Sequence, residues 1–282
     1  MKKITKIILI ISGILFCLGC ACTITGFALV NFDMSHFNHT EYTEQTADIK
    51  ESFDHIRIDI ISDDIIFRPS ENNECKVRYY DSNFIVYKLN CSDNKLSILA
   101  EQKDWFNFDI FNFGSNRSVE IYLPKKAYDD LDINTVSGDI IIDKALGSTF
   151  KEYSFNTASG DINTYLEGTG ANINTVSGDI SIGGKLSSGT VINTVSGDTT
   201  LSGITSNSLN IDTTSGDVKL NGSDAKSISI HTISGDISGE LYGKKNISVN
   251  TVSGDKDLPT SYPDGDNCSF DTVSGDIKLS GK

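Results

Sequence analysis

Apolar and polar residues alternate with a period of two through the C-terminal half of the chain, around a recurring Ser-Gly-Asp core. The fullest copies read Ile-Asn-Thr-Val-Ser-Gly-Asp-Ile, at residues 133–140 and 173–180. The position two before the threonine is large and apolar in every copy: Ile133, Phe155, Ile173, Ile192, Ile211, Ile230, Val249 and Phe270. In most copies an apolar residue also follows the aspartate. Alternation on both sides of a Gly-Asp turn predicts two short β-strands per copy.

The Ser-Gly-Asp core occurs eight times at a nearly constant spacing. It begins at Ser137, Ser159, Ser177, Ser196, Ser215, Ser234, Ser253 and Ser274, so that successive copies lie 18–22 residues apart. One copy is too small to bury an apolar face alone, whereas stacked copies bury a continuous one. The repeat predicts an all-β chain wound into a parallel β-solenoid with coils of about 19 residues. A β-propeller is the main alternative, but its blades need about 40 residues each.

One column of the repeat conflicts with simple alternation. Thr135 falls on the same face as Ile133, which leaves Val136 outside, yet most copies carry Val, Ile or Thr at the Val136 position. Either a bulge turns the chain between Thr135 and Val136, or the outer face carries a stripe of β-branched residues.

Stacking of the coils would place the motif aspartates in one row. The row comprises Asp139, Asp161, Asp179, Asp198, Asp217, Asp236, Asp255 and Asp276. Carboxylates ~4.8 Å apart repel by about 1 kcal/mol in water, and by more at a lower dielectric. Each must therefore be solvated, accept hydrogen bonds from turn amides, or be neutralised by cations. An Asx-type turn and a Ca²⁺-binding ladder are both open at this point.

The N-terminus has the pattern of a membrane anchor. Lys2, Lys3 and Lys6 precede an uncharged, largely apolar run at residues 7–32, and about 20 such residues suffice to span a bilayer as a helix. Lysines before the run and acids after it predict a cytoplasmic N-terminus and an extracellular C-terminal domain at the cell membrane. Leu18-Gly19-Cys20 offers a lipoprotein signal as the alternative. We therefore assign residues 1–32 to a transmembrane helix and residues 33–50 to a tether.

Residues 51–131 lack the regular motif and are expected to form an atypical opening section that caps the solenoid, which then continues regularly over residues 132–282. Residues 61–66, Ile-Ser-Asp-Asp-Ile-Ile, resemble a degraded motif with Asp63 in place of glycine. Within the opening section lies an aromatic run of Trp105, Phe106, Phe108, Phe111 and Phe113. It predicts either a partner-binding loop or a loop folded over the solenoid.

At the other end, the chain stops directly after the last motif, so the C-terminal coil is expected to be an open edge available for self-association.

The remaining composition restricts the chemistry. A net charge of −14 without a basic stripe argues against nucleic-acid binding. Outside the membrane run, Cys75 and Cys91 could form a disulfide or stay as buried thiols, and Cys268 occupies a core position.

The sequence contains no nucleophile elbow, phosphate loop, dinucleotide fingerprint or zinc motif, so we expect neither cofactor nor metal centre. A β-helix enzyme that cleaves polysaccharides is the catalytic alternative, although its paired carboxylates should interrupt the repeat rather than follow it.

The segment 119–124, Val-Glu-Ile-Tyr-Leu-Pro, followed by the motif at residues 131–140, resembles a bacterial domain family of unknown function named "putative adhesin". That family is grouped with toastrack domains of envelope-stress proteins, and the resemblance extends over roughly residues 53–282. It implies a single-stranded right-handed parallel β-helix outside the cytoplasmic membrane, without catalytic residues, and the N-terminal helix is similar to that of Gram-positive members.

Two functions are compatible with these patterns. In the first, the chain is a non-catalytic module that senses envelope stress or acts as a scaffold, and it engages another membrane protein or envelope component. In the second, it is a surface adhesin that binds a glycan or an external protein. The short tether favours the first function, because it keeps the solenoid close to the membrane.

Overall fold

The computed structural model describes residues 41–103 and 117–282, which form an all-β unit. The apolar run at residues 7–32 and the five aromatic residues of the 105–113 run lie outside the described residues. Within the described part of the chain, no helix is long and apolar enough to cross a membrane.

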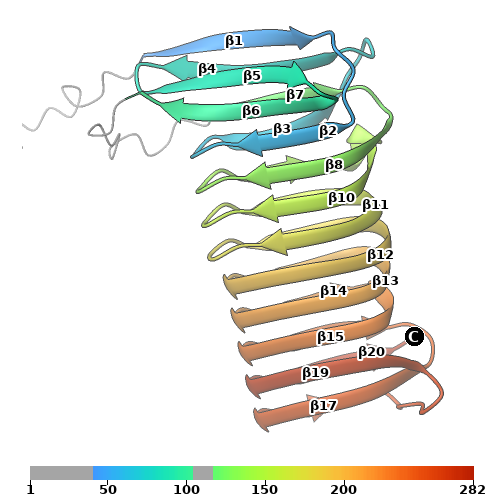
Figure 1. The fold of residues 1–282 in the computed structure, drawn as a ribbon. Helices are drawn as coiled ribbons and strands as arrows, with labels where there is room; N and C mark the ends of the chain where they lie inside the picture. The colour runs from blue at the N-terminus through green and yellow to red at the C-terminus, as the bar shows by residue number, and fades with distance from the viewer. Residues whose placement is uncertain (1–40, 104–116) are drawn as a thin grey trace, which may run out of the picture. The chain divides into compact units, whose positions relative to one another are not determined.

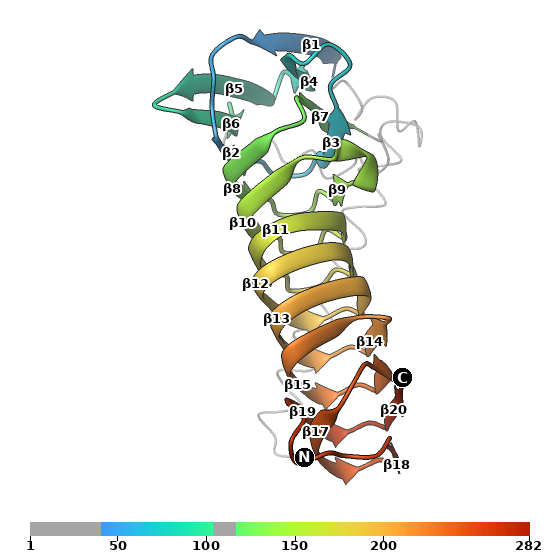
Figure 2. The ribbon, with the colours of Figure 1, turned by 90° about the vertical axis from the view of Figure 1, so that its right-hand side faces the viewer.

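The chain winds into a parallel β-solenoid in which each coil contributes one strand to each of two ladders (Figures 1 and 2). The first ladder contains β2 (His55–Asp59), β8 (Ala127–Asn134), β10 (Thr149–Asn156), β15 (Asp224–Ser234), β17 (Lys245–Ser253) and β19 (Asp266–Ser274). The second contains β3 (Asp64–Pro69), β7 (Ser118–Leu123), β9 (Ile140–Ile142), β14 (Val218–Asn221), β16 (Ile237–Leu241), β18 (Lys256–Asp257) and β20 (Ile277–Gly281). Three long strands continue around a corner and join both ladders: β11 (Ile162–Asn174), β12 (Ile180–Ser196) and β13 (Thr199–Ser215).

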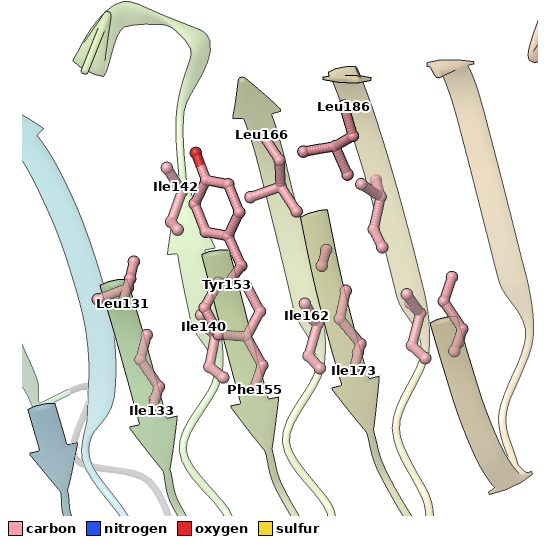
Figure 3. Close-up of a cluster of buried hydrophobic side chains, with 14 of the residues drawn as sticks. Leu131, Ile133, Ile140, Ile142, Tyr153, Phe155, Ile162, Leu166, Ile173 and Leu186 are labelled. Carbon is pink, nitrogen blue, oxygen red and sulfur yellow. The ribbon is translucent and has the colours of Figure 1, made fainter. Parts of the chain in front are cut away.

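Identical motif positions stack in register and form the core. Ile173 pairs with Ile192, and Ile192 pairs with Ile211, all of them fully buried. Residues from the two ladders, such as Ile133 and Ile140, face one another across the interior (Figure 3). The apolar positions read from the sequence therefore lie inside.

The conflict at the Thr135 and Val136 positions is resolved in favour of an exposed β-branched stripe. Thr135 is buried beside Ile133, whereas Val136 is 54% exposed. The same division between a buried threonine and an exposed next residue recurs along the stack. Alternation thus continues through these positions, and the outer stripe is a surface feature.

The glycine of each motif is required by the distance between coils. A Cβ atom on Gly178 would lie 2.2 Å from the carbonyl oxygen of Gly160, and one on Gly160 would lie 2.0 Å from that of Gly138. Gly138 in turn lies against the Asp63 carbonyl, where a Cβ would come within 2.0 Å. Asp63 therefore occupies the motif's glycine position in an earlier coil, as its sequence context suggests.

At the N-terminal end, the coil formed by β2 and β3 is not the outermost one. β2 pairs with β6 (Lys95–Gln102) on one side and β8 on the other, and β3 likewise lies between β7 and β9. Three further strands add antiparallel pairs here: β1 (Tyr42–Ile49), β4 (Cys75–Ser82) and β5 (Ile85–Ser92). Cys75 and Cys91 are free, with Cys75 buried and Cys91 partly buried.

The C-terminal end overturns the expectation that the last coil is an open edge. β19 lies between β15 and β17 (Figure 1). β20 lies between β16 and β18. The chain builds the outermost coil from β17 and β18, then returns and inserts its final coil one place inward. The C-terminal strands therefore have partners on both sides, and the prediction that the final coil is an open edge is wrong.

Some hydrogen-bonding groups on β17, in the outermost coil, are also occupied by contacts within the chain. The Tyr262 amide donates to the Lys245 carbonyl at 2.8 Å, and the Ser261 hydroxyl accepts from the Ile247 amide at 2.9 Å. The Lys256 ammonium donates to the Val249 carbonyl at 3.3 Å. These contacts occupy edge groups of β17 that would otherwise be free to pair with another strand. Ser261 and Tyr262 lie between the last two motifs, which is why the repeat pattern did not reveal their contacts.

Candidate functional site

The outer surface of the first ladder is a regular sheet face, which we call the ladder face. It consists of three columns along the eight motif coils. The first column contains Asp132, Ser154, Asn172, Val191, Asn210, Ser229, Ser269 and Ser248. The second contains Asn134, Asn156, Asn174, Asn193, Asp212, His231, Asp271 and Asn250. The third contains Val136, Ala158, Val176, Val195, Thr214, Ile233, Val273 and Val252.

Apolar exposure is concentrated on this face. Seven of the nine exposed large apolar side chains in the described residues belong to it, and only Leu258 and Tyr262 lie elsewhere. Isolated exposed apolar residues are ordinary, whereas a contiguous set marks an interaction surface. The ladder face is therefore the leading candidate for binding a partner.

The second column is organised by side-chain hydrogen bonds between coils. The Asn156 amide nitrogen donates to the Asn134 oxygen at 2.9 Å, and Asn174 donates to Asn156 at the same distance. Asn193 continues the series by donating to Asn174 at 2.8 Å. Asn156 uses one donor and one acceptor in this way, so it retains a second N–H and a second lone pair. Asn174 also donates to Asn172 at 3.5 Å. These groups are held at a regular spacing because neighbouring amides fix one another.

The motif aspartates form a second row, at the turn beside the ladder face. Asp139 Oδ1 accepts the Asp161 amide at 2.8 Å, and Asp161 Oδ1 accepts the Asp179 amide at 2.8 Å. The same bond links the later motif aspartates, at 2.7–2.9 Å. The carboxylates from Asp139 to Asp236 and that of Asp276 thus bond to an amide of the neighbouring coil, rather than closing an Asx turn within their own coil.

Two carboxylates along the aspartate row have shifted pKa values: Asp64, beside Asp139, and Asp276, in the second-last coil. Burial raises the pKa of Asp64, although its side chain accepts the Asp139 amide at 3.0 Å. A hydrogen bond from Lys278 lowers the pKa of Asp276. Within residues 41–103 and 117–282, no three His, Cys, Asp or Glu side chains are grouped to hold a metal ion. The proposed Ca²⁺ ladder at these aspartates has no further support here.

A buried carboxylate, Glu120, ties three strands together near the N-terminal end. Arg78 Nη2 lies 2.7 Å from its carboxylate, Arg68 Nη2 lies 3.2 Å away, and the Tyr122 hydroxyl donates to it at 2.6 Å. Burial alone would raise the pKa of Glu120, but the three hydrogen bonds outweigh burial and lower it. An open cavity of about 490 Å³ beside it is lined by Arg78, Tyr122 and neighbouring polar residues. Glu71 and Glu74 also line this cavity, so its charge is mixed.

Lys245 performs the equivalent role at the C-terminal end. Its side chain is buried, and its ammonium lies 2.8 Å from Asp224 Oδ1 and 3.3 Å from Asp266 Oδ2. It also donates to the Ala225 carbonyl at 2.8 Å. The outermost coil is thereby joined to β19 and to β15 beyond it. Neither Glu120 nor Lys245 lies in a Ser-Gly-Asp motif, so the repeat pattern did not reveal the role of either residue.

The chain belongs to the Toastrack DUF4097 family, which it matches over residues 53–265. Among solved structures it is similar to a "putative adhesin" from Bacteroides fragilis NCTC 9343, with 15% identity and a TM-score of 0.50, covering 85% of this chain and 97% of that one. A "putative adhesin" from Parabacteroides distasonis ATCC 8503 has 12% identity and a TM-score of 0.51, covering 86% and 97%. A "putative lipid binding protein" from the same strain has 17% identity and a TM-score of 0.50, covering 84% and 96%. At these identities the structures establish the fold. No curated protein matches the chain.

Proposed function

We propose that this chain is a non-catalytic interaction module of the bacterial cell envelope. In this proposal the run at residues 7–32 anchors it in the cytoplasmic membrane, and the solenoid lies on the extracellular side, where it engages an envelope component in stress sensing or scaffolding. The concentration of exposed apolar side chains on the ladder face carries the proposal, because such a surface on a rigid stack favours binding.

The buried charges are consistent with this assignment. Glu120 and Lys245 are each held by two oppositely charged partners that fasten strands together. The motif aspartates repeat uniformly from coil to coil, whereas acid–base catalysis needs two carboxyl groups in different environments. We therefore assign the chain no catalytic role.

Site-specific photocrosslinking in living cells tests the proposal. A photoreactive residue at Val195 samples the ladder face, and one at Ser181, an exposed position on the other ladder of the same stack, is the matched control. We expect the full chain in the membrane fraction, with a defined envelope component crosslinked from Val195 and not from Ser181. A chain found only in the soluble fraction would refute the anchor, and capture solely of external host or surface molecules would favour the adhesin.

A further inference from the structure

We propose that the ladder face binds a linear, uncharged polysaccharide that runs along the solenoid axis, and that this polymer is a glycan of the cell's own wall. The choice of source rests on the proposed function, because a solenoid anchored at the membrane lies beneath the wall.

The periodicity of the face favours a periodic ligand. Parallel neighbours lie ~4.8 Å apart, so the eight coils present the same three columns over about 34 Å. Asn156, Asn174 and Asn193 offer chemically identical groups in successive coils, linked by equal hydrogen bonds. A polymer with a repeating unit can engage several coils at once, and its affinity then rises through the multiplicity of weak contacts.

The side chains match a polymer rich in hydroxyl groups. Asn156 retains one N–H donor and one acceptor lone pair, and Asn193 retains an N–H donor, whereas a sugar hydroxyl both donates and accepts. The serines of the first column add hydroxyl groups beside them. In the third column, Val176 and Val195 are 53% and 49% exposed, so their methyl groups are available to the C–H surfaces of sugar rings. Polar and apolar stripes thus run side by side, as an amphipathic polymer requires.

Charge disfavours the other polymers. The three columns contain Asp132, Asp212 and Asp271 but neither lysine nor arginine, and the whole chain carries a net charge of −14. A polyanion such as a nucleic acid or a phosphate polymer would be repelled. A second copy of the same face would bring these acids together, which disfavours face-to-face dimers.

The face also lacks the anchors of a protein interface. Its 24 positions include no Trp, Tyr, Phe or Arg, and Trp, Tyr and Arg contribute most of the binding energy in protein interfaces. The apolar side chains that the face does carry are small or β-branched. Each described cavity lies elsewhere, at the two ends or at the corner near Lys185 and Ser206. An extended ligand on a flat surface fits these facts better than a small molecule or a globular partner.

Binding to defined glycans tests the inference. The purified full chain in detergent is sedimented with insoluble chitin, a linear uncharged polymer, and titrated calorimetrically with chitin oligosaccharides of two to eight sugars. We expect affinity to rise progressively with oligosaccharide length, because each added sugar reaches further coils. Dextran sulfate, a polyanion, should not bind.

Matched variants locate the site. Val176→Gln combined with Val195→Gln should lower affinity for the longest oligosaccharide by about tenfold, whereas Asn163→Gln combined with Ser181→Gln, at exposed positions of the other ladder, should leave it unchanged. Equal thermal stability of the two variants would confirm that both remain folded.

Three results would overturn the inference: no sedimentation with chitin or with purified wall glycan, equal losses in both variant pairs, or concentration-dependent dimers abolished by the valine variant. Failure of these assays leaves the proposed function intact if Val195 still crosslinks to a membrane protein in cells. Loss of membrane association would instead remove the proposed function itself. Binding to host glycans but not to purified wall glycan would refute the choice of source.

Discussion

At the scale of single residues, the motif is explained by close approach between coils. Serine is exposed, glycine lies against a carbonyl of the coil on one side, and aspartate accepts an amide of the coil on the other side. The glycine is needed for space at most of these positions, since a Cβ would meet backbone atoms that have nowhere to move. The glycine and the aspartate of the motif thus each have a separate physical reason to recur.

Replacing Gly178 with alanine should destabilise the solenoid by about 2–3 kcal/mol, because the added Cβ would lie 2.2 Å from the Gly160 carbonyl oxygen and force the coils apart. Chemical denaturation of the full chain measures the effect. Ser177→Ala, at the exposed neighbouring position, is the control and should change stability by less than about 0.5 kcal/mol. Equal stability of the two variants would contradict the close approach.

At the scale of strands, the order of the coils differs from the order of the chain at both ends. The β2–β3 coil lies inside the β6–β7 coil, and the β19–β20 coil lies inside the β17–β18 coil. A terminal coil held on both sides loses fewer edge hydrogen bonds than one left outermost. The insertion therefore protects both chain ends of the repeat from fraying.

Engineered disulfides distinguish insertion from sequential stacking. Ser234 pairs with Ser274, and Ser274 pairs with Ser253, whereas Ser234 and Ser253 are two coils apart. Adjacent coils at ~4.8 Å suit a disulfide, and a separation of two coils exceeds its reach of about 7 Å. We expect Ser234→Cys with Ser274→Cys to oxidise readily, and Ser234→Cys with Ser253→Cys to remain reduced, as read by peptide mass spectrometry.

The pair Ser253→Cys with Ser274→Cys is the positive control for this experiment, because these residues are neighbours in either arrangement. Oxidation of the Ser234/Ser253 pair in preference to the Ser234/Ser274 pair would show that the coils stack in chain order.

At the scale of the whole solenoid, a buried charge fastens strands near each end, and the two charges respond oppositely to pH. The pKa of Glu120 is lowered on folding from its ordinary 4.5, because the bonds from Tyr122, Arg68 and Arg78 outweigh burial. Burial lowers the pKa of Lys245, but its bonds to Asp224 and Asp266 outweigh burial and raise it above 10.5. The stabilisation from Glu120 is thus complete above about pH 4.5 and is lost as pH falls through the folded value. That from Lys245 is complete below about pH 10.5 and is lost as pH rises.

Thermal unfolding of two variants across pH checks these signs. At pH 7, Glu120→Gln and Lys245→Met should each cost about 1–2 kcal/mol, because the partners left behind are partly exposed and can be hydrated. The deficit of Glu120→Gln should shrink as pH falls below 4.5, and that of Lys245→Met should shrink above pH 10.5. If the loss of stability in either variant does not change with pH, the charge of the replaced side chain contributes nothing to stability beyond packing.

The alternation and the 19-residue spacing determine the coil, its inward residues and the aspartate row, because these depend on contacts between identical positions of neighbouring coils. Period-two alternation alone predicts that Ile173 is buried and that Val176 is exposed, as the structure shows. The same repeats carry the resemblance to the family to which the chain belongs.

Only the tertiary structure decides the order of the coils. Each copy presents nearly the same strand to its neighbours, so the sequence cannot distinguish β19 from β17 as the partner of β15. That choice depends on contacts outside the motif, such as Lys245 with Asp224 and Asp266, and the Ser261 and Tyr262 contacts with β17. The ladder face likewise emerges only on stacking, because a row of amides and valines becomes a surface once the register between coils is set.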